Sequence, residues 1–314
     1  MTDVLFINPT SSKETYQNLS NEYSAIGTPY WALLLAESCR SKGYNVNIID
    51  VLAEKLDDET FVKKVNKINA TSIVFCVYGE NVNGGTAQME GAVGLSNLIK
   101  GNVSNPISFV GSHVQALPYK VLSEEESIDI VFTNEGVYSL WDILKLGDIN
   151  NSEELENVKG IGFRKDGKPF LTEPQQVVPQ ERMDIDLPGY AWDLLPYKEK
   201  PFDLYRSPMW HAEYDEEKRT PYAMIYTSLG CKFQCGFCMI NIVNRDDNEE
   251  IGVAGNYSKM RFWSTDHVLK QFDKLIEMGV YNVRIIDEMF LLNKKYYVPL
   301  CEGLIKRGYG EKLR

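Results

Sequence analysis

Three cysteines lie close together in the chain, and their spacing is the feature of the sequence with the most chemistry in it. Cys231, Cys235 and Cys238 form the pattern Cys-x3-Cys-x2-Cys. Thiolates this close in sequence can converge on one inorganic centre, and thiolate sulfur selects iron–sulfur clusters, zinc or Cu(I). A structural zinc site needs a fourth ligand, usually from a second Cys or Cys/His pair. The remaining cysteines are scattered through apolar segments: Cys39, Cys76 and Cys301. The pattern therefore favours an iron–sulfur cluster with one iron open to a non-protein ligand.

An apolar run directly before the cysteines predicts the element that positions them. Residues Ala223–Leu229 have the composition of a buried strand, and Gly230 closes it. In a (β/α) barrel the chemistry takes place at the carboxyl ends of the strands. Cysteines that follow a first barrel strand would therefore lie at the active face. The alternative is three buried or incidental cysteines without a shared ligand.

This segment resembles the radical S-adenosylmethionine (SAM) superfamily, both in the cysteine spacing and in the aromatic Phe237 just before the last cysteine. The resemblance implies that Cys231, Cys235 and Cys238 bind a 4Fe-4S cluster and that Phe237 contributes to cofactor binding. It implies that the open iron chelates the amino and carboxylate groups of S-adenosylmethionine. It also implies reductive cleavage of SAM to a 5′-deoxyadenosyl radical, with an electron donor such as flavodoxin or ferredoxin.

Composition limits the classes of partner. The chain has 314 residues, 44% of them hydrophobic, which is ample for two globular domains. Its formal net charge of −11 argues against broad binding to nucleic acid or to an anionic membrane surface. We expect no signal peptide and no membrane span. Six cysteines, three of them clustered, indicate a reduced, cytoplasmic protein and not a disulfide scaffold.

The N-terminal half alternates between strand-like and helix-like segments, which predicts a doubly wound parallel sheet of the Rossmann type. The expected strands are Val4–Asn8, Tyr44–Asp50, Ser72–Tyr78, Ile107–Val110 and Asp129–Phe132. The expected helices are Pro29–Lys42, Asp57–Ile68, Gly84–Lys100 and Tyr138–Leu146. In such sheets ligands bind beyond the carboxyl ends of the strands.

The turns after these strands resemble the cobalamin-binding domain that precedes the radical SAM domain in one large class of the superfamily. The resemblance implies cofactor-binding residues at the following positions: Asn8, Pro9, Gly79, Gly111, His113, Glu135 and Gly136. Two departures matter. The sequence lacks an Asp-x-His-x-x-Gly motif, so no histidine of that motif can be the axial ligand of cobalt, and Val137 replaces a frequent second acidic residue. His113 has two interpretations, a contact to the corrin or its tail, or a turn histidine satisfied by neighbouring backbone.

The second half does not continue this alternation. Residues 160–171 predict a hairpin with Asp166-Gly167 at its turn. The Pro-rich, aromatic segment Asp184–Pro196 resembles the linker between the two domains of this class. An Arg-x-x-Ser pattern from Arg261 also resembles the family and opens a helix. A second barrel strand is expected over Val283–Asn293, and the resemblance implies that a carboxylate at its end, Asp287 or Glu288, pairs with the SAM ammonium. The alternative is a solvent-facing acidic pair.

These observations predict three regions. Residues 1–148 form a cobalamin-binding-like domain, residues 149–220 a hairpin and linker, and residues 221–314 the start of a radical SAM barrel. The resemblance implies a cobalamin-dependent radical SAM enzyme, of the type that includes methyltransferases and the anaerobic magnesium-protoporphyrin ester cyclase. Its cofactors would be a 4Fe-4S cluster, SAM and cobalamin, and its substrate a small molecule. Two alternatives stay open: a radical SAM cyclase or rearrangement enzyme without cobalamin, and a non-catalytic metal-binding protein. No residue is assigned a catalytic role.

Only two β/α units of the barrel can be counted after residue 220. The family's barrels contain more, and an open fragment leaves a strand edge uncovered. We therefore expect the sequence to be part of a longer enzyme, with little or no SAM cleavage by the 314-residue chain alone.

Overall fold

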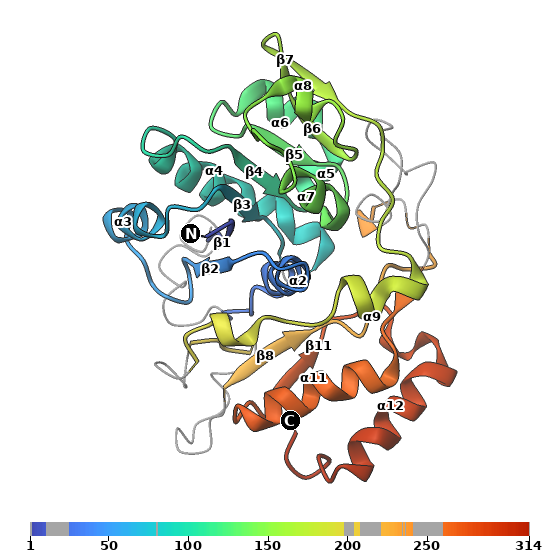
Figure 1. The fold of residues 1–314 in the computed structure, drawn as a ribbon. Coiled ribbons are helices and arrows are strands. Elements are labelled where there is room, and N and C mark those ends of the chain that lie inside the picture. Colours follow the sequence, from blue (N-terminus) through green and yellow to red (C-terminus); the bar gives the residue numbers. More distant parts are fainter. Residues whose placement is uncertain are drawn as a thin grey trace.

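The computed structural model describes residues 2–10, 25–79, 81–197, 204–207, 221–233, 235, 237–240 and 260–313. A large α/β layer formed by the N-terminal half lies above a smaller layer formed by the C-terminal part, and the linker runs between them (Figure 1). Within the described residues, no helix combines the length and the apolar character needed to cross a lipid bilayer.

A seven-stranded sheet forms the centre of the large layer, with strand order β2-β1-β3-β4-β5-β6-β7. Its parallel strands are β1 (Val4–Asn8), β2 (Val46–Asp50), β3 (Ser72–Cys76), β4 (Ile107–Val110) and β5 (Ile130–Phe132). All five are the strands that the sequence predicts, with small differences at their ends. Their residues are rich in Val, Ile and Phe and almost entirely buried, as expected for a parallel sheet covered on both faces.

Helices cover both faces of this sheet. On one face lie α3 (Asp58–Ile68), α4 (Gly85–Lys100) and α6 (Pro118–Glu124), whose apolar residues share one core with the sheet. On the other face lie α2 (Tyr30–Arg40) and α7 (Val137–Ile143). A short 3-10 turn, η2 (Val82–Gly84), precedes α4, and α5 (Ser112–Ala116) follows β4. The sheet is therefore doubly wound, as predicted.

The predicted hairpin extends this sheet. Strands β6 (Ile161–Lys165) and β7 (Lys168–Leu171) are antiparallel, and β6 pairs antiparallel with β5. Asp166 and Gly167 have φ angles of 51° and 74°, the left-handed pair that a two-residue hairpin turn needs. The sequence pattern assigned this hairpin to the linker region. In the structure it continues the edge of the sheet, after the short helix α8 (Ser152–Leu155).

The linker and the C-terminal layer are built from short elements. The linker contains η3 (Gln180–Arg182), α9 (Met183–Asp186) and η4 (Trp192–Leu194). In the C-terminal layer, β8 (Tyr222–Ile225) pairs parallel with β11 (Asn282–Ile285), and β9 (Ser228–Leu229) pairs antiparallel with β10 (Arg261–Phe262). Helices α11 (Thr265–Glu277) and α12 (Lys294–Lys306) flank them, and η7 (Phe290–Leu292) precedes α12.

Two predicted strands are shorter than expected. The run 223–229 divides into β8 and β9 because the amides between them bind side chains instead of a strand. The Tyr226 amide donates to the Tyr190 hydroxyl at 2.7 Å, and the Thr227 amide donates to Asp287 Oδ1 at 2.6 Å. The strand expected over 283–293 ends at Ile285 and gives way to the turn η7. Both breaks lie at the carboxyl ends of β8 and β11.

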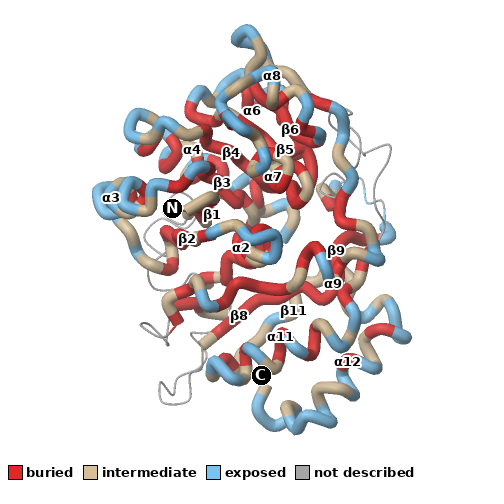
Figure 2. Tube along the Cα trace, in the orientation of Figure 1, coloured by how far each residue is buried: buried red, intermediate tan, exposed pale blue. Residues whose placement is uncertain are grey.

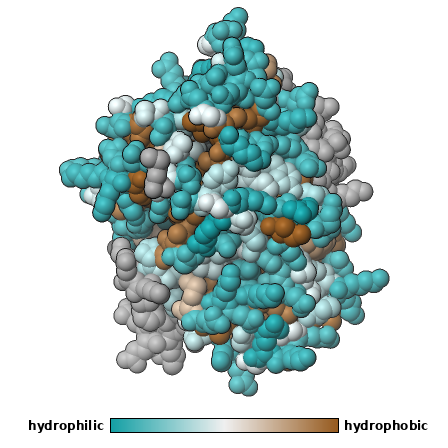
Figure 3. Space-filling model, in the orientation of Figure 1, coloured by the Kyte–Doolittle hydropathy of each residue, from teal (hydrophilic) through white to brown (hydrophobic). Residues whose placement is uncertain are grey.

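One continuous hydrophobic core joins the two layers. Helix α2 is buried on nearly all sides, between the sheet and β8 (Figure 2). Thr28 Oγ1 accepts from the Met224 amide at 2.9 Å and so ties the start of α2 to β8. The face shown in Figure 3 is mostly hydrophilic, with small separate hydrophobic areas. The interface between the layers is thus part of the folded core and not a surface contact.

Gly111, at the end of β4, is expected to be the least replaceable glycine of the sheet. Its φ is 153°, and a Cβ there would lie 2.0 Å from the Val77 carbonyl oxygen. We expect Gly111→Ala to lower the free energy of unfolding by at least about 2 kcal/mol, through strain and backbone displacement. Gly101→Ala is the control, because a Cβ there meets nothing within 4 Å. It should be neutral or stabilising by about 0.5 kcal/mol. Urea unfolding followed by circular dichroism measures both, and equal effects would contradict the packing argument.

Candidate functional site

A cavity lies at the carboxyl ends of β1 and β3, where the strand order reverses. Its volume is about 280 Å³. Asn8, Pro9 and Thr10 line it from the turn after β1, while Tyr78 and Gly79 line it from the turn after β3. Ligands of doubly wound sheets bind at this kind of switch point. Of the predicted cofactor-binding residues, Asn8, Pro9 and Gly79 are therefore brought together in one cavity.

Both layers contribute to the wall of this cavity. Tyr30 and Trp31 line it from α2, and Met224 reaches it from β8. The Tyr30 hydroxyl donates to the Gly79 carbonyl at 2.5 Å, and the Trp31 ring stacks on Tyr78 at 5.1 Å. Such aromatic contacts fix the shape of the wall before any ligand binds. The cavity is thus an interface site, and not a pocket of the sheet alone.

A buried carboxylate, Asp50, is hydrogen-bonded to Asn8 of the cavity wall. Asp50, at the end of β2, accepts from the Tyr205 hydroxyl at 3.0 Å. Burial raises the pKa of Asp50 to about 6, against hydrogen bonds from Ala53, Asn8 and Tyr205. Tyr205 begins an aromatic stretch of the sequence, residues 205–214, whose composition suits either packing between the two domains or the lining of a substrate cavity. Tyr205 itself packs; residues 208–214 lie outside the described residues.

His113 lies next to the cavity but not in its lining. Its Nδ1 is 3.0 Å from the Thr86 hydroxyl, at the first turn of α4. Burial, and secondarily the charge of Lys120, lower the pKa of this half-buried imidazole. His113 therefore has a side-chain partner in the structure, which differs from the backbone partner that one interpretation of the sequence assumed.

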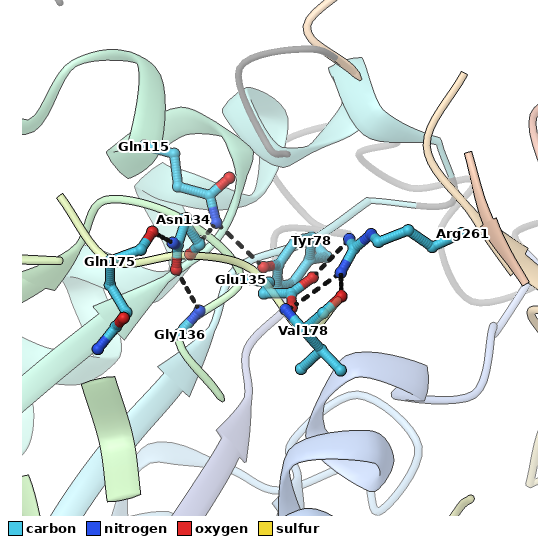
Figure 4. Close-up of polar contacts among 8 residues, drawn as sticks. All are labelled: Tyr78, Gln115, Asn134, Glu135, Gly136, Gln175, Val178 and Arg261. Carbon is cyan, nitrogen blue, oxygen red and sulfur yellow. Dashed lines mark hydrogen bonds and ion pairs between the residues drawn. The ribbon is translucent and has the colours of Figure 1, made fainter. Parts of the chain in front are cut away.

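The turn after β5 is tied into a buried polar network (Figure 4). Gln115 Nε2 donates to the Asn134 carbonyl at 2.5 Å and to the Tyr78 hydroxyl at 3.3 Å. Asn134 Oδ1 in turn accepts from the Gly136 amide at 3.0 Å, and Gly136 has a left-handed φ of 78°. The network connects the cavity wall at Tyr78 with the predicted cofactor-binding turn at Glu135 and Gly136.

Glu135 does not point into the cavity. Its carboxylate is 1% exposed and forms a two-pronged ion pair with Arg261, at 2.8 Å and 3.1 Å. It also accepts from the Val178 amide at 2.6 Å, and Arg261 donates to the Val178 carbonyl at 2.7 Å. Among the described residues, the hydrogen bonds of this carboxylate are to the linker and to β10. Sequence reasoning missed Arg261 as a partner, although its Arg-x-x-Ser pattern marked the segment.

The cysteine loop begins directly after β9. Cys231 is buried, Cys235 exposed and Cys238 half-buried, and all three are free thiols. The Phe233 amide lies 3.4 Å from Cys231 Sγ, and the Cys238 amide donates to the Cys235 carbonyl at 3.0 Å. Among the described residues, no three His, Cys, Asp or Glu side chains converge closely enough to hold a metal ion. The donor chemistry fits a thiolate-bound cluster, but the structure does not draw the three thiols together.

This loop contacts the turn between β3 and α4, which borders the cavity. The Met239 amide donates to Asn83 Oδ1 at 3.0 Å, and Asn83 belongs to the turn between β3 and α4. Asn81 and Gly84 of the same turn line the cavity. Phe237, which the sequence resemblance assigns to cofactor binding, is 83% exposed. The two sites that the sequence treats separately are therefore neighbours.

Asp287 and Glu288 have different surroundings. Asp287 accepts from the Thr227 amide and hydroxyl, both at 2.6 Å, and from the Ser228 hydroxyl at 2.7 Å. Burial raises its pKa, and these donors oppose the rise. Asp287 thus holds β11 to the turn that leads into the cysteine loop. Its hydrogen-bonding capacity is largely used for that purpose.

Glu288 has unused capacity. Its Oε2 is buried without a hydrogen-bond partner among the described residues. Burial, and the neighbouring Asp287 charge, raise the pKa of Glu288 from 4.5 to about 7. The Tyr226 side chain hydrogen-bonds to this carboxylate, but a buried carboxylate oxygen without a partner is costly and marks a candidate binding site for a cation. Sequence reasoning named this acidic pair but did not separate the two roles.

The raised pKa of Glu288 predicts a pH-dependent cost in stability. Its folded pKa lies above the unfolded value of 4.5. The folded state therefore binds the proton more tightly, and stability falls as pH rises from about 4.5 to about 7. We expect Glu288→Gln to raise the free energy of unfolding at pH 8 by about 1–3 kcal/mol, with the gain vanishing near pH 4.5. Urea unfolding across this range tests it; a gain at pH 8 no larger than that of Glu302→Gln, at an exposed position, would contradict it.

Curated proteins similar to this chain include a methyltransferase and a cyclase. No protein-family model matches the chain. An uncharacterized methyltransferase of Pyrococcus horikoshii is 25% identical over 285 residues, which cover 90% of this chain and 53% of that protein. The anaerobic magnesium-protoporphyrin IX monomethyl ester cyclase of Cereibacter sphaeroides is 22% identical over an alignment of 321 residues including gaps, which covers 99% of this chain and 45% of the cyclase. The chain thus spans about half the length of these curated relatives.

A solved structure has the same fold. The cobalamin-dependent SAM radical enzyme OxsB, determined with aqua-cobalamin and SAM bound, matches 98% of this chain and 37% of its own with a TM-score of 0.67. The two sequences are 19% identical, so this likeness concerns the fold. It confirms the predicted fold class, an α/β chain with a large doubly wound sheet whose fold matches that of a cobalamin-dependent radical SAM enzyme.

Proposed function

We propose, from the relationship of this chain to cobalamin-dependent radical SAM enzymes, that it binds a 4Fe-4S cluster, SAM and a corrinoid at one interface. The proposed reaction is the functionalisation, by methylation, of an unactivated carbon of a small-molecule substrate. A reduced flavodoxin or ferredoxin in the cytoplasm would be a suitable electron donor.

One observation supports this proposal above the others. The cysteine loop contacts the turn after β3 through the Met239–Asn83 hydrogen bond, at the rim of the switch-point cavity. Met224, from the strand that leads to the cysteines, lines the same cavity. Chemistry that uses two cofactors in sequence requires their binding sites to be close and fixed.

Cys231, Cys235 and Cys238 would hold the cluster, because they are the only three cysteines of the sequence that lie within ten residues of one another. The Phe233 amide near Cys231 Sγ is a donor of the kind that tunes cluster potentials. When bound, the cluster and the corrinoid supply the electron and the methyl group for the reaction. The chain's own part is to orient these groups and to exclude water from them.

Glu288 would accept a hydrogen bond from the ammonium group of SAM. Asp287 would keep the end of β11 together with the turn after β8. An ammonium ion beside the carboxylate would favour its charged form, so SAM binding should weaken as pH falls below about 7. We expect Glu288→Gln to weaken SAM binding to the anaerobically reconstituted protein by about 10- to 100-fold, the worth of a charge-assisted hydrogen bond. Equilibrium dialysis with labelled SAM measures this, with Glu302→Gln as the matched control. Wild-type affinity in Glu288→Gln would remove Glu288 from the site.

The corrinoid would lie over the switch-point cavity. The described residues that line this cavity include no histidine. Ala87 lines the cavity from α4, so Ala87→Trp should obstruct it, whereas Asn97→Trp on the same helix is exposed and outside the lining. Equilibrium dialysis of the full chain with hydroxocobalamin should show binding that Ala87→Trp weakens and Asn97→Trp leaves unchanged.

The alternatives give different results in the same experiment. No corrinoid binding by a protein that carries iron and sulfide would favour a radical SAM enzyme without cobalamin. One tightly bound zinc and no sulfide would favour a structural metal site. Binding of hydroxocobalamin that is equal in all three proteins would place the corrinoid away from this cavity.

A further inference from the structure

The Glu135–Arg261 ion pair connects the two candidate cofactor sites. Glu135 follows β5, whose turn is linked through Asn134 and Gln115 to Tyr78 on the cavity wall (Figure 4). Arg261 belongs to β10, where it pairs with Leu229. Leu229 is two residues before Cys231. A displacement of Arg261 would therefore move the base of the cysteine loop relative to the sheet.

The geometry of the pair is better explained by a role in fixing the distance between β10 and the turn after β5 than by a contribution to stability alone. Both side chains are almost completely buried, at 4% and 1% exposure. Buried ion pairs repay their desolvation poorly, and apolar pairs of similar size often stabilise as well. A two-pronged guanidinium–carboxylate contact, however, sets both distance and orientation. The Val178 amide and carbonyl complete the contact from the linker.

We propose that Glu135 and Arg261 are positioning residues, which hold the cysteine loop in register with the carboxyl edge of the sheet and so couple ligand binding at the two sites. The inference rests on the proposed function for the identity of the ligands. It goes beyond that function because it assigns a positioning role to Glu135, which the sequence alone predicts to be a cofactor-binding residue.

The first test needs no cofactor. Arg261→Lys keeps the positive charge but cannot form the two-pronged contact with Glu135. Glu135→Gln keeps the shape of the side chain but removes its negative charge. In the full chain, hydrogen–deuterium exchange at Leu229 to Cys231 should be at least about 10-fold faster in both variants, with the amides of β1 and β3 unchanged. Arg40→Lys is the matched control, since Arg40 forms a similar two-pronged pair with Asp193 of the linker, on the surface. Uniformly faster exchange, or wild-type exchange at the loop, overturns the inference.

The second test measures coupling. The dissociation constant for hydroxocobalamin is determined with and without saturating SAM in the anaerobically reconstituted protein. Wild type and Arg40→Lys should show a change of at least about fivefold, which is the lower end of typical coupling. This ratio of dissociation constants should fall to about one in three variants: Arg261→Lys, Glu135→Gln and the apolar double variant Glu135→Leu/Arg261→Met. Their affinity for hydroxocobalamin in the absence of SAM should equal that of the wild type.

The outcomes separate the inference from the proposed function. A wild type that binds both ligands without coupling, or variants that keep the full factor, overturns the positioning role. A wild type that binds no corrinoid or no SAM contradicts the proposed function instead. The exchange measurement then still decides whether the pair holds the cysteine loop.

Discussion

Replacing Cys235 by Ala is expected to abolish the iron–sulfur cluster. Anaerobically reconstituted wild-type protein should contain about four irons per chain and show the broad thiolate-to-iron absorbance of a 4Fe-4S cluster. Two thiolates from one loop cannot retain the cluster with the same affinity, so Cys235→Ala should lose most of the iron and all of this absorbance. Iron and sulfide analysis, together with the absorption spectrum, measures the effect.

Cys301 supplies the control for this experiment. It is an exposed cysteine on α12, away from the cysteine loop in sequence. Cys301→Ala should keep the iron, sulfide and absorbance of the wild type. Equal losses in the two variants would point to reconstitution through any accessible thiol, and would contradict the assignment of the loop.

Breaking the buried Glu135–Arg261 pair from one side is expected to be the most destabilising change away from the cysteines. Arg261→Met leaves the Glu135 charge buried and should lower the free energy of unfolding by about 3–5 kcal/mol. The double variant Glu135→Leu/Arg261→Met removes both charges and should recover most of this loss. Urea unfolding of the wild type, Arg261→Met, Glu135→Leu and the double variant forms a complete double-mutant cycle.

An exposed pair gives the scale for comparison. Lys63 and Glu59 form a pair on α3 in which both side chains are mostly exposed. Lys63→Met should cost less than about 1 kcal/mol. A cost for Arg261→Met that is no larger than this would mean that the pair is hydrated in solution, and the positioning argument would lose its basis.

The strands and helices could be predicted where the signals that define them, the hydrophobic periodicity and the capping residues, lie close to the element in the sequence. Asp57 accepts from the Thr60 amide at 2.7 Å and begins α3, and Ser264 caps α11 in the same way through His267. Asp166-Gly167 forms the predicted hairpin turn because its left-handed angles suit these residues. Each of these signals lies within a few residues of the element that it starts or ends.

The division of roles within the site was not predictable, because it depends on contacts between distant segments. Nothing in the turn after β5 indicates that Glu135 binds Arg261, 126 residues later. Likewise, Asp287 and Glu288 are adjacent in sequence, and only their surroundings distinguish the carboxylate whose hydrogen bonds hold two strands together from the one with a free buried oxygen. The break between β8 and β9 has the same origin, since Asp287 and Tyr190 satisfy its amides.

Electron paramagnetic resonance of the doubly loaded protein tests most directly whether the two cofactor sites are neighbours. The full chain is reconstituted with the cluster and cob(II)alamin, and the relaxation of the cob(II)alamin signal is measured with the cluster oxidised and reduced. The contact between the cysteine loop and the cavity rim predicts faster relaxation when the cluster is reduced, and no change in Cys235→Ala. Relaxation of protein-bound cob(II)alamin that is identical in both cluster states would contradict a shared interface site.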